Sequence, residues 1–491
     1  MKEENKERWV LFLIFLVVLG SRLYFVFQTP YFNDEAYLDY RIITNIAETG
    51  KPFFYDSLSY NGRDLLYSPV FHYILAFFNL LLPLNFVLKV IPSIFISLLV
   101  FVVYWLSSLL VKEKNLALFA SLLSGFIPII FINTLNNISV YTLVLPLTFY
   151  LLYLLLKVKG KKDIWKFITL SFVLALLHPS AFFFLLTVLF FMILMVSEGF
   201  EVAKIKKELI LFSVFVILFI EFLIYKKAFI VHGIDIVRTN VPTQVLANYF
   251  DFSFLDVVLK IGILLIILGL SGIIFGWVRK REEIYLLGSL ILSILILSGL
   301  KLIRLEVGLM FLGTALVIVS CVSFEILLKY LDKTRLAKRK NLVIFSFVFI
   351  LIFSLVLPSF IGASKNIDYE TPTNYEILVL NWIKENALPD ITILAPIEKG
   401  HLITALAGKR NVIDSNFLLA PETSERYKDV NTIYTSRSEV KALELIRKHN
   451  VDYILIPIET ELNTGKGSWL NDEGCFEGVF FGTPKVYKVI C

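Results

Sequence analysis

Two adjacent acids, Asp34 and Glu35, are the first residues of the chain whose type and position suggest chemistry. They follow an apolar run in which residues 10–19 carry no charge and only Arg22 interrupts before Thr29-Pro30. An ionised Asp at the centre of a bilayer costs roughly 2.5–3.5 kcal/mol, so we expect the pair at or just beyond the membrane surface. A carboxylate fixed there can take a proton from a reacting group. We predict that Asp34 and Glu35 are catalytic, acting on something delivered by lipid.

A lipid-borne phosphate needs cationic partners, and two arginines are candidates for this role. Arg304 stands at the start of a late apolar run, and its planar guanidinium suits a phosphate. Arg22 lies near the end of the first apolar run, where an ionisable residue is by default a functional hypothesis. Two plainer interpretations stay open. Arg22 can simply reach the headgroups, and the two acids can simply favour the start of a helix.

Two histidines and two tyrosines complete the candidate site. His72 and His178 precede or enter apolar segments, where either can bond a phosphate or a sugar hydroxyl. Tyr37 and Tyr67 can stack on a sugar ring. Buried histidines with ordinary partners, and tyrosines that pack at the membrane interface, explain the same residues equally well.

The composition excludes a soluble globular protein. Hydrophobic residues make up 57% of the chain, charged residues 18%, and the mean hydropathy is +0.76. Apolar runs recur as far as residue 361, which predicts a polytopic α-helical membrane protein. The net charge of +6 is too small and too dispersed to indicate a nucleic-acid partner.

The apolar runs predict about eleven spans. We expect them near residues 9–27, 90–111, 115–132, 141–157, 165–177, 180–197, 208–225, 257–277, 284–300, 305–328 and 342–361. Lys and Arg cluster in alternate loops, as in 157–166 and 329–340, whereas 132–140 has none. By the positive-inside rule, the N-terminus is cytoplasmic and the acid pair lies outside, in a multi-pass protein of the cell membrane.

The expected topology gives two domains, a membrane domain over residues 1–361 and an extracytoplasmic domain over 362–491. The first outer loop, 28–89, is long, and long ordered loops often carry function. Within it we predict an amphipathic helix over 36–49, ended by Gly50, and an interfacial helix over 70–83.

The C-terminal 130 residues or so have an ordinary composition and suffice for a core. Apolar strands alternate with helical patterns, which predicts a small α/β domain with a partly parallel sheet. The expected helices are 374–387, 399–407 and 438–449, and the expected strands are 391–396, 411–414, 452–457, 476–481 and 485–490. Cys475 and Cys491 share this outer compartment, so a disulfide is permitted, and the sequence leaves its formation open.

The arrangement resembles the C-type glycosyltransferases, which have the GT-C fold. Asp34-Glu35-Ala36-Tyr37 looks like the Asp-Glu start of protein mannosyltransferases and aminoarabinose transferases, and residues 67–73 resemble the Pro-rich entry into their next helix. Ile303-Arg304-Leu305 is similar to the arginine segment of oligosaccharyltransferase catalytic subunits. Residues 399–416 are similar to the region after the WWDYG motif of those subunits.

The sequence departs from the oligosaccharyltransferase pattern at two places. Pro396-Ile397-Glu398-Lys399-Gly400 stands where those enzymes carry WWDYG, and residues 133–141 lack their second acidic motif. Both departures argue against transfer of an oligosaccharide to Asn in a sequon. The second also leaves a divalent cofactor, Mg²⁺ or Mn²⁺, an open question, and no other cofactor is indicated.

The resemblance implies an enzyme that moves a sugar from a dolichyl- or undecaprenyl-phosphate donor, with inversion at the anomeric carbon. The expected partners are the lipid-linked donor, membrane lipid, and an acceptor that is protein, lipid or glycan. Two other classes remain as alternatives: an oligosaccharyltransferase-like enzyme with a pyrophosphate-linked donor, and a non-catalytic membrane protein or transporter.

Overall fold

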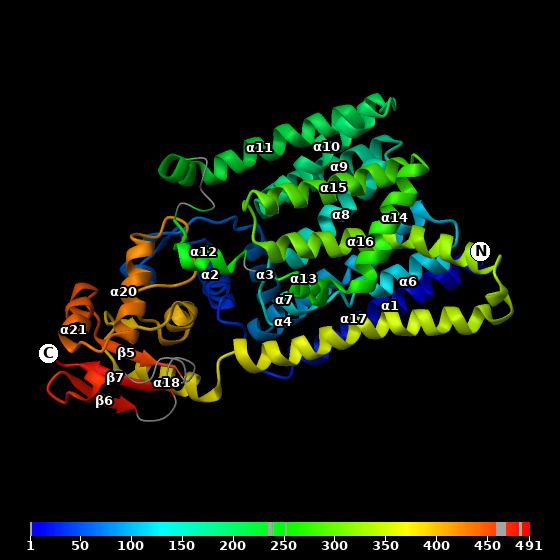
Figure 1. Ribbon diagram of the computed structural model, residues 1–491. Helices are drawn as coiled ribbons and strands as arrows, with labels where there is room; N and C mark the ends of the chain where they lie inside the picture. Colours follow the sequence, from blue (N-terminus) through cyan, green and yellow to red (C-terminus); the bar gives the residue numbers. More distant parts are fainter. Residues whose placement is uncertain (1, 234–237, 239, 251–252, 458–467, 481–483) are drawn as a thin grey trace.

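The computed structural model describes residues 2–233, 238, 240–250, 253–457, 468–480 and 484–491. It consists of a bundle of long apolar helices followed by a C-terminal domain built on a five-stranded sheet. Figure 1 shows the N-terminus at one end of the bundle and the C-terminal domain at the other. The predicted fold class, a polytopic helical membrane protein with a C-terminal α/β domain, is confirmed.

Most of the bundle helices lie where the apolar runs predict them. They are α1 (Lys2–Val26), α4 (Leu84–Ser97), α5 (Leu99–Leu110), α6 (Lys114–Ser124), α7 (Pro128–Asn133), α8 (Tyr141–Lys157), α9 (Lys161–Leu177), α10 (Ala181–Ser197), α11 (Lys204–His232), α14 (Ile263–Val278), α15 (Glu282–Gly299), α16 (Leu305–Leu331) and α17 (Lys340–Glu370). α17 continues nine residues past the expected domain boundary at residue 361.

Among the described residues, six helices are long and apolar enough to cross a membrane, or seven if the bent pair α13–α14 is one span. Shorter apolar helices such as α8 and α10 have 17 residues each, which gives a length of about 25 Å. The number of eleven spans therefore stays a prediction.

Two of the expected spans are broken, each for a local reason. The run 115–132 divides into α6 and α7 because Pro128, which lacks an N–H, begins a new helix. The run 257–277 divides at Gly262 (φ 101°), where α13 (Phe254–Ile261) meets α14 at 86°. The apolar run 257–277 is therefore bent, because Gly262 adopts a left-handed conformation that L side chains avoid.

The segment between α1 and α4, which we call the first outer segment after the expected loop 28–89, contains the predicted amphipathic helix, α2 (Ala36–Thr49). Gly50 ends this helix in a left-handed conformation. The next helix, α3 (Val70–Asn79), is followed by α4 from Leu84, which begins inside the expected loop 28–89. Between them the strands β1 (Tyr55–Asp56) and β2 (Arg63–Asp64) pair antiparallel.

The C-terminal sheet has the strand order β4-β3-β5-β7-β6. β3 is parallel to β4 and β5, whereas β7 is antiparallel to β5 and β6, so the expected partly parallel sheet is confirmed. The strands are β3 (Thr392–Leu394), β4 (Arg410–Asn411), β5 (Tyr453–Ile456), β6 (Phe476–Phe480) and β7 (Lys485–Val489). Residue 481 of the predicted strand 476–481 lies outside the described residues.

Helices cover the sheet and connect its parallel strands. They are α18 (Asn374–Asn386), the turns α19 (Gly400–Leu402) and η5 (Ile403–Ala407), α20 (Thr423–Thr435) and α21 (Glu439–Lys448). Sequence analysis did not predict α20. Cys475 and Cys491 are disulfide-bonded, and Cys321 is a buried free thiol.

Buried polar contacts join the first outer segment to the C-terminal domain. Arg63 ion-pairs with Asp414 at 3.6 Å, both side chains being fully buried. Ser59 donates a hydrogen bond to the Asp414 carboxylate at 2.5 Å, and Tyr60 donates to the Asp414 carbonyl at 2.7 Å. The membrane and C-terminal parts therefore share one continuous interface on the side of the acid pair.

Candidate active site

The acid pair lies where the end of α1, the α7–α8 loop and the end of α17 meet. The Asn33 N–H donates to the Asn136 carbonyl at 2.9 Å, and the Asp34 N–H donates to the Glu370 carbonyl at 3.3 Å. These bonds fix the backbone immediately before α2. The two neighbouring side chains then diverge and take different cationic partners.

Asp34 turns toward the C-terminal domain and meets Lys399. The Lys399 ammonium donates to Asp34 at 3.1 Å and to Glu376 at 3.0 Å, and its side chain is 8% exposed. Glu376 is held in place by a capping box with Thr373 at the start of α18. One cation therefore lies between two carboxylates from opposite parts of the chain.

The Asp34 carboxyl has a raised pKa. Burial raises the pKa of Asp34 to about 7, although the neighbouring Lys399 opposes the rise. Burial alone would lower the pKa of Lys399, but Asp34 and Glu376 raise it above its usual value, so the lysine stays charged. Asp34 Oδ1 is buried and accepts no hydrogen bond from any residue that the structure describes. That oxygen is in the right state to accept a proton from an incoming hydroxyl.

Glu35 turns the other way and meets Arg304. The Arg304 guanidinium lies 3.6 Å from the Glu35 carboxylate, at the residue that caps the start of α16. It also donates to the Tyr249 hydroxyl at 3.0 Å and stacks over that ring at 4.3 Å. Arg304 and the acid pair, far apart in sequence, thus lie on the same side of the bundle. At 45% exposure, the guanidinium is open to a ligand.

A second ion pair lies beside the first. Glu306 accepts from Lys260 at 2.7 Å and from the Asn133 amide at 3.1 Å. The charges of both Glu35 and Glu306 act on Glu370 at the end of α17. The bend at Gly262 puts Lys260 on α13 rather than inside a straight span. Sequence analysis did not predict Lys260 or Lys399 as site residues, although Lys399 lies in the segment 396–400 that stands in the place of WWDYG.

The other predicted site residues lie apart from this charge cluster or at its margin. Arg22 is buried, donates to the backbone and hydroxyl of Thr134, and stacks on Phe131, so its contacts are those of a packed side chain. His72 bonds Asp39 at 2.7 Å. His178 makes a hydrogen bond of 3.1 Å with the Ser180 hydroxyl. Burial and, to a smaller extent, the positive charge of Arg304 lower the pKa of His178.

The two tyrosines make aromatic contacts. Tyr37 is 3% exposed and packs edge-on against Phe32. Tyr67 lies against the His72 ring at 5.1 Å and donates to the Phe53 carbonyl at 3.2 Å. Of the predicted residues, the structure therefore brings together Asp34, Glu35 and Arg304, with His178 nearby.

Comparison with solved structures identifies the fold. The chain superposes on archaeal oligosaccharyltransferase AglB from Archaeoglobus fulgidus, in complex with an inhibitory peptide and a dolichol-phosphate, with a TM-score of 0.69 and 15% identity over 94% of this chain and 70% of that one. ArnT from Cupriavidus metallidurans gives a TM-score of 0.61 and 9% identity, covering 96% and 97%. The chain has the GT-C fold. No protein-family model and no curated protein matches the sequence.

One further structure of the Archaeoglobus fulgidus oligosaccharyltransferase, with a TM-score of 0.64, 16% identity and coverage of 97% and 73%, contains zinc and sulfate. In the present chain, Glu35 and Glu306 each already hold a cationic side chain. Among the described residues, one group of three potential metal-binding side chains has its ligand atoms close together, namely Glu439, Asp472 and Cys475. The sulfur of Cys475 is already disulfide-bonded. The residues at the candidate site, as arranged, do not fit a divalent metal.

The raised pKa of Asp34 predicts a specific pH dependence. If Asp34 is the base, kcat/KM falls as the pH drops through about 7, because the carboxyl becomes protonated. Lys399→Met removes the nearest opposing cation, so the pKa of Asp34 rises and the acidic limb moves up by about 1–3 pH units. The measurement is the pH profile of kcat/KM. Lys384→Met, an exposed lysine on α18, is the matched control. A limb that stays in place in Lys399→Met would contradict the role given to Asp34.

Proposed function

We propose that this protein is a membrane glycosyltransferase that moves a sugar from a polyprenyl-phosphate donor to an acceptor hydroxyl outside the membrane. The observation that carries the proposal is the divided acid pair. Asp34 keeps a free, buried oxygen, and Glu35 beside it holds an exposed Arg304. The proposed proton acceptor, Asp34, is thus next in sequence to the residue that holds the proposed phosphate partner, Arg304. The GT-C fold supports the same conclusion.

The proposed reaction uses both partners. The acceptor hydroxyl loses its proton to Asp34, and its oxygen attacks the anomeric carbon. The bond from that carbon to the phosphate oxygen breaks, and the electron pair leaves with the phosphate. Arg304 exchanges Glu35 for the phosphate and stabilises the growing negative charge. Attack opposite the leaving group inverts the anomeric carbon, as the family resemblance implies.

An apolar groove between α10 and α11 suits the hydrocarbon part of such a donor. It has a volume of about 480 Å³ and is lined by Phe182, Leu218, Phe222, Phe229 and Gly233 of α10 and α11. Phe182 comes two residues after Ser180, which bonds His178. We propose that the polyprenyl chain of the donor lies in this groove.

The proposed location follows from the same arrangement. We take the N-terminus as cytoplasmic and the C-terminal domain as extracytoplasmic, in the cell membrane, because the basic loops predict that orientation. The acceptor is a protein, lipid or glycan that reaches Asp34 from the outer side.

The function is tested directly with membranes that contain the protein and a panel of radiolabelled polyprenyl-phosphate sugars. Wild type should release or transfer sugar from at least one donor. Asp34→Asn should lower turnover by about 10²–10⁴-fold, because the positioned base is lost. Asp390→Asn, an exposed acid of the C-terminal domain, is the matched control and should retain activity. A scaffold or transporter would show no transfer from any donor.

A second candidate, an oligosaccharyltransferase-like enzyme with a pyrophosphate-linked donor, is favoured by the likeness to AglB. It differs in its expected dependence on a metal. With Lys260 and Arg304 already paired to the site carboxylates, we expect transfer to persist in EDTA. Transfer lost in EDTA and restored by Mg²⁺ or Mn²⁺ would favour the second candidate. The measurement is the initial rate before and after chelation, with a donor of each kind.

A further inference from the structure

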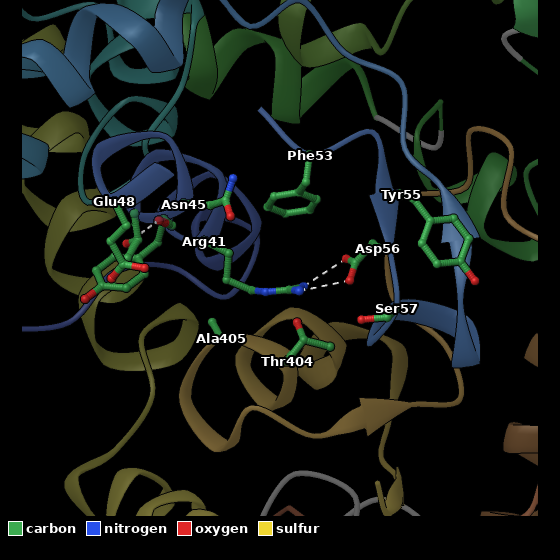
Figure 2. A pocket seen from close by; sticks show the side chains of 11 residues that line it. Arg41, Asn45, Glu48, Phe53, Tyr55, Asp56, Ser57, Thr404 and Ala405 are labelled. Atoms are coloured by element: carbon green, nitrogen blue, oxygen red, sulfur yellow. Dashed lines mark hydrogen bonds and ion pairs between the residues drawn. The ribbon is translucent and has the colours of Figure 1, made fainter. Parts of the chain in front are cut away.

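A polar cavity lies between the first outer segment and the C-terminal domain, beside the acid pair. It has a volume of about 380 Å³, within the range of roughly 300–1,000 Å³ that small-molecule sites occupy. Its walls come from α2, from residues 53–57 and from η5 (Figure 2). Neither Asp34 nor Glu35 lines it, so it is a site separate from the proposed chemistry.

An ion pair crosses the cavity. Arg41 donates two hydrogen bonds of 2.9 Å each to Asp56, and the Phe53 ring stacks 5.5 Å from the guanidinium. Burial favours protonation of Asp56, but Arg41 and the Leu58 N–H hold its pKa below the usual value, so the pair stays charged. Figure 2 shows Phe53 on one side of this pair and Thr404 on the other.

The charge balance of the lining excludes an anionic ligand. Asp56 neutralises Arg41, and Glu48 adds a negative charge, so the cavity offers no unpaired cation to a phosphate or carboxylate. The lining is mostly polar, which disfavours a lipid chain. Asn45 donates its amide to the Lys51 carbonyl at 2.6 Å, which leaves the amide oxygen to accept from a ligand.

With anionic ligands and lipid chains set aside, the lining suits a neutral ligand that is rich in hydroxyl groups. Such a ligand should also have an apolar C–H surface that can pack against an aromatic ring. Planar polar groups in the Arg41–Asp56 pair and Asn45, with the aromatic side chain of Phe53, offer those contacts together. A sugar has this combination of hydroxyl edges and apolar faces. The lining therefore has the chemistry of a carbohydrate site.

The position of the cavity connects it to Asp34 in two ways. α2 begins directly after Glu35, so Arg41 stands about 10 Å along the helix from the acid pair. The segment 399–405 supplies Lys399 to Asp34 and Thr404 and Ala405 to the cavity. The cavity and the proposed base are therefore built on the same two chain segments.

We propose that this cavity binds a neutral oligosaccharide and holds the distal part of a glycan acceptor whose reacting hydroxyl lies at Asp34. The inference names the acceptor class of the proposed transferase and so rests on that function. Binding at the cavity can nevertheless be measured without any donor, which separates the two claims.

The test is equilibrium binding of neutral trisaccharides of mannose, glucose and galactose to the full-length protein in lipid nanodiscs. At least one should bind saturably, and inorganic phosphate should not displace it. Asn45→Leu should weaken binding about tenfold or more, because a sugar hydroxyl loses its acceptor. Ala405→Trp should abolish binding by filling the cavity. Asn431→Leu, the same change on the exposed face of α20, should leave binding and thermal stability as in wild type.

Parallel donor turnover by wild type and Asp34→Asn distinguishes the two possible failures. Turnover that depends on Asp34, with no trisaccharide bound, overturns the cavity proposal and leaves the transferase. Binding that Asn45→Leu weakens and Ala405→Trp abolishes, without any turnover, supports the cavity and overturns the transferase. Displacement by phosphate, or equal binding by Asn45→Leu and Asn431→Leu, also overturns the carbohydrate assignment.

Discussion

The structure of the site depends on one buried ammonium group held between two carboxylates. Lys399 reaches from the C-terminal domain to Asp34, just before α2, and to Glu376 of α18. Burying charges is costly, and only close pairing offsets that cost. Removing Lys399 would leave two acids facing each other with little exposure. The C-terminal domain is therefore part of the site, and the Arg63–Asp414 pair fastens the same interface nearby.

Separation of the two neighbouring acids gives them different chemistry. Asp34 is largely buried, has a raised pKa and keeps one oxygen without a partner. Glu35 is 55% exposed and holds Arg304 in an ion pair that a phosphate can replace. Lys260 on Glu306 adds a second cation within the same cluster. In the proposed reaction, such a site would bind the anionic leaving group with side chains of the protein itself and would keep a less polar environment for the base.

Local patterns predicted the elements well but not all of the partners. The helix 36–49, its end at Gly50, the helix 438–449 and the partly parallel sheet follow from periodicity and capping, and all are present within a residue or two. Asp34 was recognised because an acid after an apolar run is unusual. Its partner Lys399 was not, since an ion pair that spans hundreds of residues leaves no periodic trace. Lys260 was missed because one glycine, Gly262, turns an apparently continuous span by 86°.

The central claim is that a lipid-linked phosphate binds at Arg304 with its sugar directed to Asp34. It is tested most directly by a cryo-EM structure of the full chain in nanodiscs with a bound polyprenyl phosphate. The account predicts phosphate oxygens within about 4 Å of the Arg304 guanidinium, the chain in the groove of α10 and α11, and the open side of the phosphate facing Asp34. A phosphate bound away from Arg304, or at the opposite end of the helix bundle from Asp34, would contradict it.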